Sequence, residues 1–375
     1  MKESLLNIEK NLLNTDNTLV NFSNSILKHF GVDPFHLTIK EVDEALKGHK
    51  KVAVFLFDGA SEYNLGLYPR TNRFILSHKL KTIYSVNPAT TVACTTAFLS
   101  AKFPIETGWL GWSLNFPNLG PIDVFTGKSS YSDKRYNPSP INDFAPYTNI
   151  GKILTSHGVN AKIAFEYPVE NLDGPKNYRE ALRKYGDFFQ KENGEFLYGY
   201  FKNPDHTIHG AGVKSLKTHW QFSKIAWFVK RFVKQNPDVI VFTFADHGLI
   251  NVTYDDVSAH KDLEDCLSAP ISLDCRIPTF FVKEGRKEEF VTLFNRYFGN
   301  DYLLVSKEDA ISLNYFGEGE PSEASLTFLG DYIGVAKGNA AMKEYFGKTD
   351  PHPCLAHHSG ASKEEREVLL AVYNR

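Results

Sequence analysis

The sequence predicts an α/β fold with a mostly parallel central sheet and helices on both of its faces. Three apolar runs, at residues 52–57, 196–201 and 239–244, are continuous rather than alternating, which is typical of strands buried on both faces of a sheet. Segments with helical spacing lie between them, and the longest covers residues 216–235. Strands that alternate with helices favour a parallel sheet, because each parallel connection crosses over through a helix.

The N-terminal residues 1–48 lack the strand pattern and are predicted to form a helical extension. Apolar residues recur at helical spacing in segments 21–30 and 38–46, and Asp33-Pro34 marks the break between them. Residues 49–375 are predicted to form the α/β domain proper. Its further elements are expected to be helices at 91–101, 150–157 and 288–297 and strands at 161–165 and 277–282.

Two long segments of this domain do not follow the alternation. Residues 108–150 are rich in Gly, Pro, Asn, Ser and aromatics, and a connection of this length is usually a functional loop. Residues 259–335 are expected to form either a small cap or a continuation of the sheet.

The composition is that of an ordinary soluble protein. The chain has 375 residues, of which 23% are charged, and a formal net charge of -2. No block of Lys and Arg stands out, which argues against stable nucleic-acid binding. No segment approaches the roughly 20 apolar residues that span a membrane, and no signal peptide is visible. The four scattered cysteines fit a reducing compartment, so we expect a cytoplasmic protein with no membrane association.

Polar side chains close two of the buried runs. Asp246 and His247 follow the run at 239–244, and Asp58 follows the run at 52–57. An Asp-Gly pair after a strand is ordinarily a turn, so Asp58 alone would carry little weight. Because ligands bind at the carboxyl ends of parallel strands, these side chains are nevertheless candidate metal ligands.

The third run and the C-terminal region supply more candidates. Asp205 and His209 follow residues 196–201 and stand four residues apart, on one face of a helical turn. His357 and His358 precede a capping box, Ser362 with Glu365, that predicts a last helix. These histidines could be ordinary loop residues, although small neighbours allow the backbone to approach a metal.

Threonines 90, 91 and 95 lie at the predicted start of the helix at 91–101. A hydroxyl there is a helix cap by default. The same position favours an anion, and a threonine can act as a nucleophile when a metal lowers its pKa. Carboxylates and histidines after three strands, together with a hydroxyl, suffice for two adjacent metal sites that promote phosphoryl transfer.

In order and context, these segments resemble the alkaline phosphatase superfamily, most closely its type I phosphodiesterase/nucleotide pyrophosphatase branch. The resemblance runs from about residue 51 to the C-terminus and rests on five motifs: Phe57-Asp58-Gly59, Asn87-Pro88-Ala89-Thr90-Thr91 with Gly108-Trp109-Leu110-Gly111, Pro204-Asp205-His206-Thr207-Ile208-His209, Ala245-Asp246-His247-Gly248, and His358-Ser359-Gly360-Ala361-Ser362. It implies an alkaline-phosphatase-like catalytic domain at residues 49–375.

The resemblance also implies two divalent metal ions, zinc in the first place, with manganese or magnesium as alternatives. One ion would be bound by Asp205, His209 and His358, and the other by Asp58, Asp246 and His247. Thr91 would be the nucleophile and a ligand of the second ion. Thr90 and His357 are the alternatives at their two positions.

The implied function is hydrolysis of a phosphodiester or pyrophosphate bond through a phosphothreonine intermediate. The substrate would be a small phosphate ester, with a nucleotide as one candidate. The alternatives are a phosphomonoesterase or phosphotransferase of the same superfamily, and a catalytically silent protein that binds a phosphate ligand.

The expected substrate contacts depart from the family pattern. Many relatives carry a phosphate-binding Asn three residues after the nucleophile, where this chain has Cys94, and some carry a base-stacking aromatic where it has Val92. A thiol is a weak donor, so the backbone of Val92 and the side chain of Thr95 are the expected replacements. Trp109 and Trp112 are expected to line the substrate.

Overall fold

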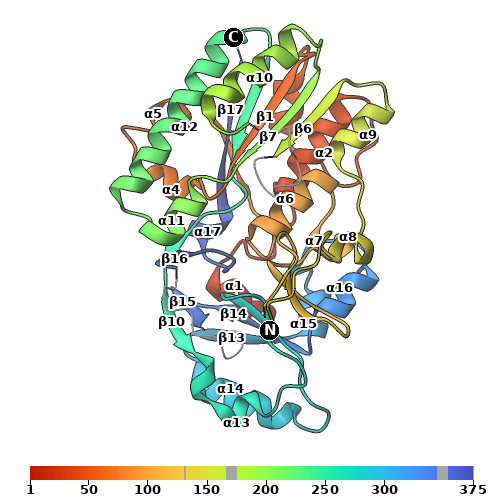
Figure 1. Cartoon of the computed structure of the whole chain (residues 1–375), viewed down its shortest axis with the longest axis vertical. Coiled ribbons are helices and arrows are strands. Elements are labelled where there is room, and N and C mark those ends of the chain that lie inside the picture. Colours follow the sequence, from red (N-terminus) through yellow and green to blue (C-terminus); the bar gives the residue numbers. More distant parts are fainter. Residues whose placement is uncertain (131, 166–174, 344–353, 375) are drawn as a thin grey trace.

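The computed structural model describes residues 1–130, 132–165, 175–343 and 354–374, which are arranged around two β-sheets (Figure 1). The central sheet has six strands in the order β2-β17-β8-β1-β7-β6. Their bounds are Lys79–Tyr84, Glu367–Tyr373, Ile240–Phe244, Val52–Phe57, Phe196–Phe201 and Ala161–Phe165.

The central sheet is mixed, so the prediction of a mostly parallel sheet is partly wrong. Strands β6, β7, β1 and β8 pair in parallel, as predicted from the alternation of strands and helices. Strand β17 pairs antiparallel with both β8 and β2. The helix predicted after Ser362 is a single turn, α17 (Lys363–Arg366), and the apolar run that follows it forms β17. A short apolar run fits a buried strand as well as a helix, which is why its period alone did not reveal this strand.

Helices cover both faces of the central sheet, as predicted (Figure 1). One face carries α10 (Tyr178–Gln190) and α12 (Leu216–Gln235), which pack against each other. The other carries α2 (Leu19–His29), α6 (Thr91–Ser100) and α9 (Ile150–Ser156). The bounds of α6, α9 and α12 lie within one residue of the predicted ones.

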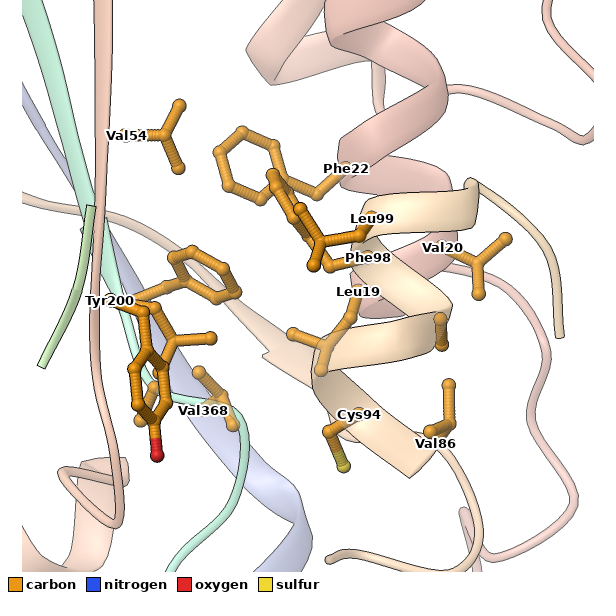
Figure 2. Packing of buried hydrophobic residues seen from close by; sticks show 14 of the residues in the cluster. Leu19, Val20, Phe22, Val54, Val86, Cys94, Phe98, Leu99, Tyr200 and Val368 are labelled. Carbon is orange, nitrogen blue, oxygen red and sulfur yellow. The ribbon is translucent and has the colours of Figure 1, made fainter. Parts of the chain in front are cut away.

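The N-terminal segment is helical and shares the core of the domain. It contains α1 (Lys2–Ile8), α2 and α3 (Lys40–Leu46). The ring of Phe22 on α2 lies 5.4 Å from that of Phe98 on α6 and 5.3 Å from that of Phe244 on β8. Figure 2 shows Phe22 and Phe98 between the two helices and the sheet. The segment is therefore part of the main hydrophobic cluster.

A second, antiparallel sheet is built from the two segments that break the α/β alternation. Its seven strands follow the order β13-β14-β12-β11-β3-β4-β5, with bounds Tyr302–Ser306, Tyr332–Ala336, Ile277–Phe280, Ser272–Asp274, Ser113–Phe116, Gly120–Asp123 and Lys128–Ser129. Residues 108–150 are thus more than a loop, and residues 259–335 do not extend the central sheet. Pairing of Leu273 with Ser113 joins the two segments.

The remaining elements are short or flank the second sheet. Two small strand pairs connect it to the central body, β10 (Thr253–Asp256) with β15 (Ala340–Lys343) and β9 (Ile250–Asn251) with β16 (Ala356–His357). The other helices are α4 (Glu62–Gly66), α5 (Arg73–Leu76), α7 (Pro104–Thr107), α8 (Ile141–Phe144), α11 (Asp205–Ala211), α13 (Lys261–Glu264), α14 (Lys287–Phe298), α15 (Lys307–Ser312) and α16 (Glu323–Phe328), with a 3₁₀ turn at Val257–Ala259. Among the residues that the structure describes, no helix is both long and apolar enough to cross a membrane.

Candidate metal centre

The carboxyl ends of three parallel strands bring the predicted ligands to one edge of the central sheet. Asp58 follows β1, Asp205 follows β7, and Asp246 with His247 follows β8. The pairing continues past the strand ends, since the Asp58 amide donates to the Phe201 carbonyl and the Asp205 amide donates to the Asp58 carbonyl, both at 2.9 Å. The backbone pairing of these strands therefore fixes the relative positions of the residues that carry the carboxylates.

One group of candidate ligands consists of Asp58, Asp246 and His247, all buried, with ligand atoms within 4.8 Å of one another. His247 Nε2 lies 3.4 Å from Asp58 Oδ1 and 3.4 Å from Asp246 Oδ2. The hydroxyl of Tyr200 donates to the other oxygen of Asp58, and the Gly59 amide donates to Asp246 Oδ1 at 3.2 Å. Gly59 has a φ of +75°, and a Cβ there would lie 2.5 Å from Leu249, so this turn requires glycine.

The structure brings the other predicted set, Asp205, His209 and His358, together in part: the group whose ligand atoms lie within 4.8 Å of one another is Asp205, His247 and His358. Asp205 Oδ1 lies 3.2 Å from His209 Nε2 and 3.9 Å from His358 Nε2. His209 Nδ1 lies 2.9 Å from the carbonyl oxygen of Ala356, which orients the ring and turns Nε2 toward the carboxylate. The His358 ring stacks on that of His247 at 4.0 Å, so the two groups are adjacent.

Burial and charge set the electrostatics of these groups. Burial raises the pKa of Asp58 well above its ordinary value, and the negative charges of Asp246 and Asp205 raise it further. Burial also raises the pKa of Asp246. Burial, the largest single influence, acts in the same direction on Asp205, but interactions with His209, His247 and His357 together outweigh it and hold the pKa of Asp205 below its ordinary value. Burial lowers the pKa of His358 well below its ordinary value, which keeps this imidazole neutral.

Several buried polar atoms here have no hydrogen-bond partner, namely Asp205 Oδ1, Asp246 Oδ2 and His358 Nδ1. Unpartnered buried acceptors are costly, and three carboxylates in one buried site repel one another. Divalent cations would relieve both costs, and the mixture of carboxylate oxygen and imidazole nitrogen suits zinc. The residues present therefore fit bound metal.

Thr91 is the first residue of α6 and faces the first of these groups. Its Oγ1 lies 3.1 Å from His247 Nε2 and 3.4 Å from the nearer oxygen of Asp58. The Thr90 hydroxyl instead donates to Asp274 Oδ2 at 2.9 Å, away from that group. Of the two hydroxyls, only that of Thr91 therefore faces the candidate ligands, and the amino end of a ten-residue helix beside it favours an anion.

Most of the residues expected to contact substrate are buried in the interior of the protein. Val92 and Cys94 are fully buried, and Figure 2 shows Cys94 among the apolar residues of the core. Cys94 Sγ lies 3.0 Å from Ser85 Oγ. The Thr95 hydroxyl donates to the Thr91 carbonyl at 2.6 Å. These positions favour packing roles for Val92, Cys94 and Thr95.

The two tryptophans precede strand β3 of the second sheet. The Trp109 indole donates to the Ala145 carbonyl at 2.8 Å and is buried. Trp112 is half-buried, and its ring lies 5.9 Å from that of Phe125. A substrate contact by either tryptophan stays a prediction.

Two neighbouring residues were missed by the sequence reasoning. Tyr200 lies inside the apolar run of β7, where its hydroxyl was the only local signal of a polar role. Asp274 lies at the end of β11 and reaches the start of α6 through Thr90. Burial raises the pKa of Asp274 to about 7, although the hydrogen bond from Thr90 opposes this. No local sequence pattern indicated a functional role for Asp274, because its neighbours come from distant segments of the chain.

Comparisons with known proteins bear on this site. A family model described as type I phosphodiesterase / nucleotide pyrophosphatase matches residues 52–273. A search of curated proteins found no match.

Solved structures of similar fold were also found. Murine ectonucleotide pyrophosphatase/phosphodiesterase 5 has a TM-score of 0.64 at 15% identity, with 87% of this chain and 88% of the other covered, and an inactive variant of it in complex with AMP gives the same values. The human protein of that name has a TM-score of 0.65 at 14% identity, over 86% of this chain and 88% of the other. Phosphonoacetate hydrolase from Sinorhizobium meliloti 1021, in complex with phosphonoformate, has a TM-score of 0.63 at 13% identity, over 86% and 90%. At such low identity, these structures establish the fold.

Proposed function

Since the chain belongs to the type I phosphodiesterase/nucleotide pyrophosphatase family of hydrolases, we propose that it hydrolyses a phosphodiester or pyrophosphate bond through a phosphothreonine intermediate at Thr91. The observation that carries the proposal is the position of the Thr91 hydroxyl, 3.1 Å from His247 and beside Asp58. A hydroxyl held at a cluster of candidate metal ligands and at a helix amino end suits attack on phosphorus.

Two divalent ions, with zinc as the proposed metal, would be held by Asp205, His209 and His358 and by Asp58, Asp246 and His247. When bound, they supply Lewis-acid stabilisation of the phosphoryl oxygens and lower the pKa of the nucleophile. The fit is supported by the orphaned acceptors of Asp205 and Asp246 and by the neutral imidazole of His358.

Residues of α6 have distinct roles in the proposed reaction. Thr91 Oγ1 forms the bond to phosphorus as the leaving alkoxide or phosphate departs, and water then cleaves the phosphothreonine and restores the hydroxyl. The amino end of α6 places backbone N–H groups, including that of Val92, where they stabilise charge on the phosphoryl oxygens. The side chain of Thr95 is bonded to the Thr91 carbonyl, so it contributes to helix geometry in this mechanism.

The proposed substrate is a small phosphodiester or nucleotide-like pyrophosphate. The family match supports this class, and the complex of the murine relative with AMP shows that a protein of this fold holds a nucleoside monophosphate. The net charge of -2 gives no support to a nucleic acid as the substrate.

The test compares hydrolysis of bis-(p-nitrophenyl) phosphate and p-nitrophenyl phosphate by metal-loaded wild type and Thr91→Ala. We expect Thr91→Ala to lose diester hydrolysis by about 10³-fold or more, the scale on which removal of a covalent nucleophile acts. Thr91→Ser should retain part of the activity, because it keeps the hydroxyl.

A matched control is Thr96→Ala, which removes another buried threonine hydroxyl from α6 and should leave the rate within a few-fold of wild type. Equal rates for wild type and Thr91→Ala would refute the phosphothreonine mechanism. Faster turnover of the monoester would refute the diesterase assignment.

A further inference from the structure

A second set of metal-type side chains lies beside the candidate metal centre and includes none of the six ligands assigned to it; His357, the alternative to His358 in the sequence, belongs to this set. It consists of Asp274, Cys275 and His357, whose ligand atoms lie within 4.8 Å of one another. Asp274 and Cys275 are buried and His357 is half-buried. We propose that this set binds a third divalent ion of the zinc type, with a thiolate in its coordination shell.

Two backbone segments position the three donors: the β11–β12 turn carries Asp274 and Cys275, and strand β16 carries His357. Asp274 ends β11, and Cys275 begins the tight turn into β12. The carbonyl of Cys275 accepts from the Met342 amide at 2.8 Å and from the Tyr302 hydroxyl at 3.0 Å, so the turn is fixed. A preorganised backbone lowers the cost of bringing the donors to an ion.

His357 approaches this turn from the other side. It ends β16, and its pairing with Ile250 of β9 sets its position. Its Nδ1 atom has no hydrogen-bond partner. An imidazole nitrogen without a partner, close to a thiol and a carboxylate, is available as a ligand.

The donor atoms of the set favour zinc over other divalent ions. Sulfur, nitrogen and oxygen donors together are typical of zinc, whereas magnesium and calcium take oxygen ligands. The neighbouring Arg276 would oppose a cation if its charge were free. Arg276 Nε instead donates to Glu365 Oε1 at 2.7 Å, both side chains being fully buried, so its charge is balanced.

A neighbouring set is less informative. His209, Cys354 and His357 also have ligand atoms within 4.8 Å of one another. Because His209 is an expected ligand of the first catalytic ion, a metal bound there would belong to the centre already described. Only the Asp274 set is independent of it.

A third ion here would have a structural consequence for the active site. It would tie the β11–β12 turn of the second sheet to the segment that carries His358. It would also reach the start of α6, since Asp274 accepts the Thr90 hydroxyl. The ion would thus link the second sheet to strand β16, next to the start of α6.

Cobalt substitution provides the test, because the ligands expected for the two catalytic ions contain no sulfur. Full-length protein is stripped with a chelator and titrated with Co²⁺ while its near-ultraviolet spectrum is recorded. We expect a thiolate-to-cobalt charge-transfer band whose final intensity corresponds to one thiolate-bound cobalt per chain, that Cys275→Ser abolishes, and that Cys354→Ser retains. Thr91→Ala should retain the band while losing activity, so this proposal and the proposed function fail separately.

Two further variants guard against misfolding. Cys266→Ser removes another buried cysteine, outside both sets, and should keep the band. If circular dichroism shows that Cys275→Ser does not fold, His357→Gln serves in its place. This variant should bind cobalt about 10-fold or more weakly, as measured from the charge-transfer band. Absence of the band in wild type, its persistence in folded Cys275→Ser, or its loss in Cys354→Ser alone would overturn the proposal.

Discussion

Asp58 is oriented by a tyrosine that lies within the buried strand β7. The Tyr200 hydroxyl donates to one carboxylate oxygen, which leaves the other beside His247. Partners of this kind set the direction and basicity of a ligand without touching the metal.

Replacement of Tyr200 with Phe should therefore weaken metal binding by about 10–100-fold, the usual effect of losing such a partner. The measurement is competition for zinc with a chromophoric chelator. Tyr185→Phe, another buried tyrosine that stacks on Phe55, should leave the affinity unchanged. Equal affinities for the two variants would show that Tyr200 does not support the site.

The sequence predicted the proposed ligands better than the residues around them. Asp58, Asp205 and Asp246 each follow a buried strand, and a strand end is a local feature of the sequence. Tyr200 and Asp274 act on segments remote in the chain, so their roles depend on which strands pair and in which register.

At the scale of the element, α2 is an integral part of the core rather than an accessory helix. Phe22 is fully buried and contacts Phe98, Phe242 and Phe244. Phe22→Ala should lower the free energy of unfolding by about 3–5 kcal/mol, the usual cost of an aromatic cavity. Urea denaturation measures this. The control, Phe35→Ala, removes a ring that is 48% exposed and should have little effect.

The turn α17 is anchored by a buried ion pair. Glu365 accepts from Arg276 through both of its carboxylate oxygens, at 2.7 and 2.9 Å, and from the Gly360 amide at 2.8 Å. The pair thus joins the second sheet to the loop that follows His358. The capping box with Ser362, which the sequence predicted, uses the same carboxylate.

Glu365→Ala should destabilise the protein by about 3–5 kcal/mol, because it leaves a buried guanidinium without its partner. Glu289→Ala removes a comparable pair with Arg286 whose carboxylate is 50% exposed, and it should change stability far less. Urea denaturation of both variants distinguishes them. A similar loss in both would contradict the role assigned to burial.

At the scale of the whole molecule, the metal centre is a source of instability when no metal is bound. Burial and the charges of Asp246 and Asp205 raise the pKa of Asp58 in the folded chain. The unfolded chain ionises this carboxyl at its ordinary pKa, so above that value the folded state binds more protons. The stability of the metal-free protein should therefore fall as the pH rises through this window.

Asp58→Asn should remove that penalty and raise the melting temperature of the metal-free protein by a few degrees at neutral pH. In excess zinc the order should reverse, because wild type gains the free energy of metal binding and the variant loses a ligand. Thermal melting with chelator and with zinc measures both. A variant less stable than wild type in chelator would contradict the electrostatic argument.

The sequence by itself determined the fold class, the order of the main elements and the segments that carry the proposed ligands. Apolar runs, helical spacing and polar strand ends are local properties, so they are visible without tertiary contacts. Only the tertiary structure decided that residues 108–150 and 259–335 share one sheet and that β17 lies antiparallel between β8 and β2. It also decided that Tyr200 holds Asp58 and that Asp274 meets His357. Strand partners and register follow from contacts between distant segments, and no single stretch of sequence contains them.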